Sequence, residues 1–262
     1  MKIIVCIKQV IDTAARIRIT DGKIDAAGSP RVINPYDEFA LEEAIRIREK
    51  IPETEIIALT LGPDGFKDAL KTALAMGADR AVHLIDPAFE GLDNLGVARA
   101  LAKAIRKLSF DLILCGRQAV DDDMAQVGPA IAIFLGIPAV AVVTQLSLSE
   151  DLRLANVTRQ IEGGSEKLVA QLPLLLTCQK GLNTPRLPSL KGIISAKKKP
   201  VETMDAGAIG FDPAEDGEPA NRVREIELNL PPERKKGRIL EGSASEAVAS
   251  LAQLLRDEEK VI

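Results

Sequence analysis

The stretch CGRQAVDDDMAQVGPAI, residues 115–131, concentrates groups that could do chemistry. Three adjacent carboxylates, Asp121, Asp122 and Asp123, stand between an apolar run typical of a buried strand and a small-residue segment typical of a helix. Like charges repel, so other groups must hold these side chains. They can belong to a solvated loop with a helix cap, contact a bound ligand, or bind a metal ion.

The backbone of the same stretch suggests an anion site. We expect a strand to end near Gly116 and a helix to begin at about Met124, which leaves the N–H groups of Ala125 to Gly128 without helical partners. Free amides at the start of a helix attract anions. A phosphate could therefore lie on these amides, while the carboxylates turn away to cap the helix or to reach ribose hydroxyls.

Other kinds of site lack the residues they need. The single histidine, His83, lies inside the apolar run RAVHLI, which leaves no acid–base histidine and no Ser-His-Asp arrangement. Neither GxGxxG nor GxxxxGK[ST] occurs. Cys6, Cys115 and Cys178 lie far apart in apolar runs, so we expect reduced core thiols and no metal site.

The elements that must position this loop follow from hydrophobic periodicity. Five runs are apolar on both faces, and amphipathic helical segments lie between several of them; the runs are KIIVCIK, EIIALTLG, RAVHLI, DLILCG and PAVAVV. This alternation predicts an α/β fold with a doubly wound, mostly parallel sheet, which is Rossmann-like. Ligands bind such sheets beyond the carboxyl ends of the strands, so the loops IKQVID, LGPDG and CGRQAVDDDMAQVGP should form the site.

The pattern changes after about residue 145. The segment around EGGS predicts a hairpin, followed by an apolar strand at residues 172–178. Residues 181–242 are rich in proline and polar residues, which predicts an extended arm that needs another surface to rest on. We place the nucleotide-binding α/β domain at residues 1–185 and the C-terminal arm at residues 186–262, ending in an amphipathic helix capped by Ser243 or Ser245.

Composition narrows the classes of partner. The chain has 262 residues, a formal charge of −4 and 3% aromatic residues without tryptophan, which argues against nucleic-acid binding. No apolar run reaches the roughly 18 residues of a membrane span, so we expect no direct membrane insertion. The N-terminal MKIIVCIKQV has no signal-peptide pattern, and we expect a cytoplasmic protein.

Several segments together resemble one family, the beta (small) subunit of electron transfer flavoproteins. The matching pieces follow the order and spacing of the family and cover most of residues 1–201; they are INPYDEFALEEAIRIRE, TALAMGADRAVHL, CGRQAVDDDMAQVGP, VTRQIEGGSEKL and GLNTPRLPSLKGIISAKKKP. The resemblance implies an electron carrier rather than an enzyme, with FAD shared with an alpha subunit and an AMP buried in this subunit. It implies acyl-CoA dehydrogenase-type flavoenzymes as electron donors and a quinone-linked oxidoreductase as acceptor.

The resemblance also implies site residues. Leu190 matches the leucine of the recognition loop that docks onto acyl-CoA dehydrogenases, and the arm would wrap the alpha subunit. Asp37, in INPYDEFALEE, is also a candidate cap of the helix that follows. The nucleotide contacts implied by the matched motifs are Cys6, Asn34, Pro35, Tyr36, Asp37, Leu61, Arg117, Gln118, Ala119, Val120, Asp121, Asp122, Asp123, Met124, Ala125, Gln126, Val127 and Gly128.

Three alternatives stay open at this point. An electron-bifurcating member would bind a second FAD in place of AMP and use NADH; Asp122 stands where many such members have glycine, which favours AMP. An enzyme that hydrolyses adenine nucleotides or adenylates a substrate would need a glycine-rich phosphate grip, which the sequence lacks. A scaffold subunit would have the same fold with an empty pocket.

Overall fold

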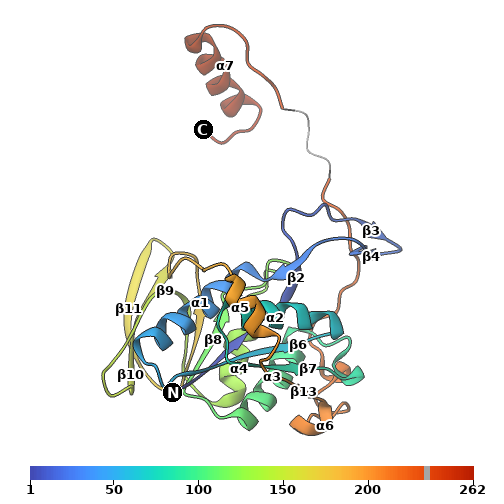
Figure 1. The fold of residues 1–262 in the computed structure, drawn as a ribbon. Coiled ribbons are helices and arrows are strands. Elements are labelled where there is room, and N and C mark those ends of the chain that lie inside the picture. Colours follow the sequence, from blue (N-terminus) through green and yellow to red (C-terminus); the bar gives the residue numbers. More distant parts are fainter. Residues whose placement is uncertain (233–236) are drawn as a thin grey trace. The chain divides into compact units, whose positions relative to one another are not determined.

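A computed structural model describes residues 1–232 and 237–262 (Figure 1). Residues 233–236, which belong to the predicted C-terminal arm, lie outside the described part. The chain forms two units. The first comprises residues 1–18 and 24–226, and the second comprises residues 19–23 and 227–262.

A nine-stranded sheet forms the centre of the first unit (Figure 1). Its order is β11-β10-β9-β12-β8-β1-β6-β7-β13, and all neighbours are parallel except in the β9-β10-β11 segment. The strands are β1 (Lys2–Cys6), β6 (Glu55–Leu61), β7 (Arg80–Leu84), β8 (Leu112–Gly116), β9 (Ala139–Leu148), β10 (Leu154–Ile161), β11 (Gly164–Gln171), β12 (Leu174–Cys178) and β13 (Val201–Met204). The predicted α/β class with a mostly parallel sheet is confirmed.

Helices cover both faces of this sheet because its central strands are apolar on both sides. In β1, Ile3 and Val5 pack in one core with α1 and α2, while Ile4 packs in the other core with α3 and α4. The helices are α1 (Pro35–Lys50), α2 (Lys67–Met76) and α5 (Leu190–Ala196) on the first face, and α3 (Asn94–Leu108), α4 (Val127–Leu135) and α6 (Ala206–Ile209) on the second.

Short elements connect these layers. β2 (Gln9–Ile11) pairs with β5 (Arg31–Ile33) in an antiparallel arrangement, and β3 (Ile19–Thr20) and β4 (Lys23–Ile24) form another two-stranded sheet. Single 3₁₀ turns occur at η1 (Asp64–Phe66), η2 (Pro87–Phe89) and η3 (Glu218–Ala220).

The strand order reverses at β1. The chain first builds β6 and β7 on one side of β1 and then returns to place β8 on the other side. The loops after β1 and β8 therefore diverge at the carboxyl edge of the sheet, which is where open α/β sheets bind ligands.

The first unit extends beyond the boundary that we placed after residue 185. Strand β13 pairs with β7 at the edge of the sheet, and Ala206, Ile209 and Phe211 are buried against the α3 side. The ring of Phe211 meets that of Phe89 edge to face, with 5.2 Å between centroids. Within residues 186–226, α5 thus packs on α2, β13 joins the sheet, and α6 packs against α3.

The second unit contains α7 (Ala244–Asp257). Ser243 caps this helix as predicted: its Oγ accepts a hydrogen bond from the Glu246 amide, and the Glu246 carboxylate accepts one from the Ser243 amide. No residue of α7 is buried.

Candidate functional site

A cavity of about 290 Å³ lies at the carboxyl ends of β1, β6 and β8, beside the start of α4. It contains residues from the three loops that the sequence singled out. Among the predicted contacts, those that line it are Cys6, Asn34, Asp37, Leu61, Arg117, Gln118, Ala119, Asp122, Ala125, Gln126, Val127 and Gly128.

The remaining predicted contacts do not line the cavity; they are Pro35, Tyr36, Val120, Asp121, Asp123 and Met124. Sequence reasoning also missed ten lining residues: Ile7, Lys8, Leu59, Phe66, Leu92, Asn94, Val97, Leu101, Cys115 and Gly116. Lys8 could have been found, since it lies in the loop IKQVID directly after the first strand. Asn94 carries no signal of its own, because it only opens a helix whose other end is far from the site.

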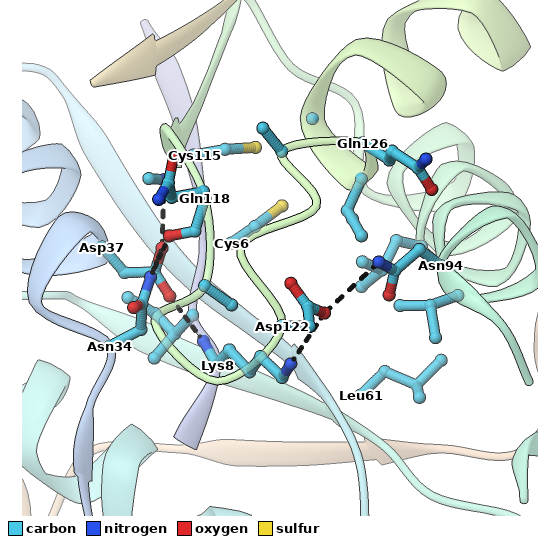
Figure 2. A pocket seen from close by; sticks show the side chains of 18 of the residues that line it. Cys6, Lys8, Asn34, Asp37, Leu61, Asn94, Cys115, Gln118, Asp122 and Gln126 are labelled. Atoms are coloured by element: carbon cyan, nitrogen blue, oxygen red, sulfur yellow. Dashed lines mark hydrogen bonds and ion pairs between the residues drawn. The ribbon is translucent and has the colours of Figure 1, made fainter. Parts of the chain in front are cut away.

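Asn34 and Asp37 join the loops around the cavity (Figure 2). The Asn34 side-chain amide donates to Asp37 Oδ1 and to the Gln118 carbonyl, both at 2.9 Å, and its Oδ1 accepts from the Val120 amide at 3.1 Å. Asp37 Oδ2 accepts from the Lys8 amide at 2.7 Å, and Oδ1 accepts from the Gly116 amide at 3.0 Å. These two side chains therefore fix the loops after β1 and β8 against the start of α1.

Asp37 is not the cap of α1 that we expected. The helix begins at Pro35 with Asn34 in the N-cap position, and no side chain makes a capping hydrogen bond there. Asp37 lies one turn further on, and its carboxylate points toward β1 and β8. The reason is that the neighbouring strand ends present free amides, which are better partners for a buried carboxylate.

Glycine at position 116 makes this junction possible. A Cβ atom there would lie 2.2 Å from Asp37 Oδ1 and 2.8 Å from the Asp37 amide nitrogen. Any larger residue would push the end of β8 away from α1 and break the hydrogen bond to Asp37.

The Asp37 carboxyl is buried, with 6% of its surface exposed. Burial raises the pKa of Asp37 to about 7, against the opposing effect of the Lys8, Asn34 and Gly116 donors, which favour the carboxylate. The junction therefore holds a group that titrates near neutral pH.

The three adjacent aspartates are held by Lys8, Gln118 and Asn94, and Lys8 contacts two of them. Lys8 Nζ lies 2.7 Å from Asp121 Oδ1 and 3.4 Å from Asp122 Oδ2, and the Gln118 side chain donates to Asp123 Oδ1 at 2.5 Å. The Asn94 amide also donates to Asp122 Oδ2 at 3.3 Å, so Asp122 bridges Lys8 and α3 at the cavity (Figure 2). The described residues contain no cluster of three or more side chains suited to a metal ion.

The start of α4 offers free amides, although the helix begins at Val127 and not at Met124. The loop continues for three more residues because Asp123 and Ala125 adopt left-handed backbone conformations, each with φ of +53°. The first intrahelical bond is from the Ala130 amide to the Gln126 carbonyl, so the amides of Val127 and Gly128 have no helical acceptor.

Gly128 lets α4 approach the sheet closely. A Cβ atom there would lie 2.8 Å from the Thr177 methyl of β12 and 3.5 Å from Cys115 Cβ. The free amides thus lie beside the cavity only while position 128 carries no side chain.

The cavity combines two surfaces. One wall is apolar and comes from β6, η1, α3 and the loop before α3; its residues are Leu59, Leu61, Phe66, Leu92, Val97 and Leu101. The other carries Lys8, Arg117 and the amides at the start of α4. An apolar wall suits a planar ring, and amides with nearby cations suit an anion, so the site can bind a small ring-bearing anion.

Of the other residues that the sequence singled out, Cys6 and Cys115 line the cavity, whereas His83, Cys178 and Leu190 do not. His83 is fully buried in β7, with Nε2 2.9 Å from the Gly62 carbonyl oxygen, and does not line the cavity. All three cysteines are free and buried, as expected. Leu190 begins α5 and keeps 76% of its surface exposed.

Titration of Asp37 should change the stability of the folded chain. Because burial raises its folded-state pKa from 3.8 to about 7, the folded chain keeps a proton there that the unfolded chain loses between about pH 4 and pH 7. Its stabilising contribution is full below this window and is lost as the pH rises through 7. We expect the gap between the urea midpoints of wild type and Asp37→Asn to narrow from pH 5 to pH 8.

Asp37→Asn is the control for the pH dependence of all other titratable groups, because both proteins share those groups and the asparagine side chain does not titrate. A gap that stays constant, or widens with pH, would contradict the raised pKa.

Comparison with known proteins identifies relatives over the whole length. The family described as "Electron transfer flavoprotein domain" matches residues 21–209. The chain is 41% identical over 263 residues to an "Electron transfer flavoprotein subunit beta" of Bacillus subtilis, with 100% of both chains covered. It is 39% identical over 260 residues to the protein of that name in Bos taurus, with 98% of each chain covered.

A third relative has a different name. The "Caffeyl-CoA reductase-Etf complex subunit CarD" of Acetobacterium woodii is 39% identical over 260 residues, again with 98% of each chain covered.

No helix in the described part of the chain is long and apolar enough to cross a membrane. By the family match and the relatives at about 40% identity, the chain belongs to the electron transfer flavoprotein family, as a beta-subunit member.

Proposed function

We propose that this chain is the nucleotide-holding half of a heterodimeric electron carrier. It pairs with an alpha subunit, shares FAD with it, and passes electrons from acyl-CoA dehydrogenase-type flavoenzymes to a quinone-linked oxidoreductase. The observation that carries the proposal is the cavity between β1 and β8, which has an apolar wall and free amides but no histidine among its lining residues. Such a site suits tight binding better than acid–base chemistry.

The nucleotide held in this cavity is AMP in our proposal. The cavity volume of about 290 Å³ lies just below the range for small-molecule sites, about 300–1,000 Å³. Asp122, bridged to Lys8 and Asn94, lines the cavity and fills space that a glycine would leave open. The residues proposed to hold AMP are the twelve predicted contacts that line the cavity, with Lys8 and Asn94 added.

The redox chemistry belongs to the FAD, whose isoalloxazine ring accepts and releases electrons when it is bound. This chain contributes a fixed surface and the nucleotide site. The second unit, in which no residue of α7 is buried, is the part proposed to contact the alpha subunit. An apolar helix face gains stability only when another surface covers it.

A second candidate is an electron-bifurcating subunit with a second FAD in the cavity and NADH as reductant. The name of the Acetobacterium relative favours it, since that protein is described as part of a caffeyl-CoA reductase complex. Sequence identity does not separate the two candidates, because this relative is about as similar to the chain as the relatives named electron transfer flavoprotein subunit beta. Our preference for AMP therefore rests on the bridge that Asp122 forms at the cavity. The adenylating or hydrolysing alternative lacks the glycine-rich phosphate grip that it needs, since GxxxxGK[ST] does not occur in the sequence.

The substitution Gly128→Val tests whether the nucleotide binds at the start of α4. Valine at this position would press on Thr177, where a Cβ atom already comes within 2.8 Å, and would move α4 and its amides away from the cavity. Overpacking of this kind costs about 1–3 kcal/mol, which corresponds to about ten- to a hundredfold weaker retention of the nucleotide. The measurement is the amount of nucleotide that co-purifies with the Gly128→Val heterodimer.

Gly164→Val is the matched control, because nothing lies within 4 Å of a Cβ atom at that hairpin position. It should leave the nucleotide content unchanged. Full nucleotide content in Gly128→Val would show that the phosphate does not depend on the start of α4.

The substitution Leu190→Ala tests whether this chain docks onto an electron donor. The Leu190 side chain is 76% exposed, and an exposed leucine on a helix followed by the lysines at 197–199 suits an apolar pocket on a partner protein. Leu190→Ala should weaken docking by about 1–3 kcal/mol, or about ten- to a hundredfold, and slow electron transfer from a reduced acyl-CoA dehydrogenase. Flavin content and the thermal melt of the heterodimer should stay as in wild type.

The melt separates the two interpretations of this leucine. Slow transfer with an unchanged melt supports docking through Leu190. A lowered melt with normal transfer would mean that Leu190 stabilises the fold and that donors dock elsewhere.

A further inference from the structure

Helix α5 has an exposed apolar side and a closely attached opposite side. Leu190 and Ile194 lie one turn apart, so they share a face, and they are 76% and 57% exposed. The opposite side of the helix rests on α2. A helix of only two turns has little stability of its own, so its contacts with the rest of the chain decide where Leu190 and Ile194 are held.

The first attachment precedes the helix. Arg186 binds Glu42 of α1 through two parallel hydrogen bonds of 2.8 Å, from Nε to Oε2 and from Nη2 to Oε1. Its backbone amide also donates to Glu42 Oε2 at 3.1 Å, and its Nη1 donates to Glu49 at 2.6 Å. Glu42 is only 4% exposed, so this is a well-oriented pair with one buried partner.

The second attachment follows the helix. Lys199 Nζ donates to the carbonyl oxygens of Leu74 at 3.0 Å and of Ala78 at 2.5 Å. These carbonyls belong to the last turn of α2 and to the residues just after it, where a cation is favoured by the helix dipole. The ammonium group therefore fixes the end of the α5 segment to α2.

The third contact lies inside α5 itself. A Cβ atom at Gly192 would lie 2.2 Å from the Ala75 carbonyl oxygen of α2, which is a backbone atom and cannot rotate away. The Gly192 amide is meanwhile fixed by the Ser189 hydroxyl at 3.0 Å. Glycine thus sets the distance between α5 and α2, and a methyl group would force the helices apart by about 1 Å.

We propose that Arg186, Gly192 and Lys199 are positioning residues that hold α5 in one fixed arrangement. The surface formed by Leu190 and Ile194 is then already in place when an electron donor binds. This proposal rests on the proposed function, since it concerns the docking of a flavoenzyme donor. A preformed surface binds more tightly than one that must first be ordered. The alternative is a flexible strap that orders only on binding, in which the three residues would have little effect on docking.

The first test is tryptic cleavage of the purified heterodimer without any donor. Cleavage after Lys191 or Lys197 requires α5 to leave α2, so a fixed helix should be cut slowly. Gly192→Ala and Arg186→Gln should be cut at these two bonds roughly ten times faster than wild type. Wild type cut as fast as the variants, as seen by mass spectrometry of the fragments, would overturn the proposal.

The second test is steady-state electron transfer from an acyl-CoA dehydrogenase reduced by its acyl-CoA substrate. Gly192→Ala should raise the KM for the heterodimer about tenfold and leave kcat and flavin content unchanged. Gly207→Ala is the matched control, because that helical glycine has only an ordinary contact of 3.5 Å at its Cβ position. Arg186→Lys should fall between wild type and Arg186→Gln, since lysine keeps the charge but loses the paired geometry.

The two tests separate the possible failures. Slow transfer in Leu190→Ala with wild-type KM in Gly192→Ala and Arg186→Gln would overturn the positioning role and leave the docking function standing. If the wild-type heterodimer accepts no electrons from acyl-CoA dehydrogenases, the proposed function fails, and the cleavage test still decides whether the three residues fix α5.

Discussion

The buried carboxylate of Asp37 is the constraint on which the site depends. Its two oxygens accept hydrogen bonds from the amides of Lys8 and Gly116 and from the side chain of Asn34. These donors come from the two strand ends that flank the reversal of strand order and from the start of α1. Without an acceptor there, two strand-end amides would be buried without partners, at a cost of about 1–3 kcal/mol each.

The rest of the site follows from this junction. Gly116 must lack a side chain so that β8 can end against Asp37, and the loop that leaves β8 then carries its aspartates over the cavity. Lys8, whose backbone is held by Asp37, binds Asp121 and Asp122 with its side chain. Lys8 thus links the buried junction to the charged margin of the cavity. The repulsion among the carboxylates of residues 121–123 is offset by partners from separate parts of the chain.

The sequence correctly predicted the features of the fold that are determined by local hydrophobic patterns. Doubly apolar runs predicted the parallel sheet, and the rule for strand ends predicted which loops meet. It failed where long-range contacts decide: Asp37 has the pattern of a helix cap but binds two distant amides, and β13 is too short and polar to stand out until it pairs with β7. Asn94 likewise joins the site only through the fold.

The most direct test of the central claim is the identity and number of nucleotides in the wild-type heterodimer. The purified complex would be denatured, and the released compounds would be separated by chromatography and quantified by absorbance. Our account predicts one AMP and one FAD per heterodimer. Two FAD without AMP would show that the cavity holds a second flavin, and FAD alone would show that the cavity between β1 and β8 is not a nucleotide site.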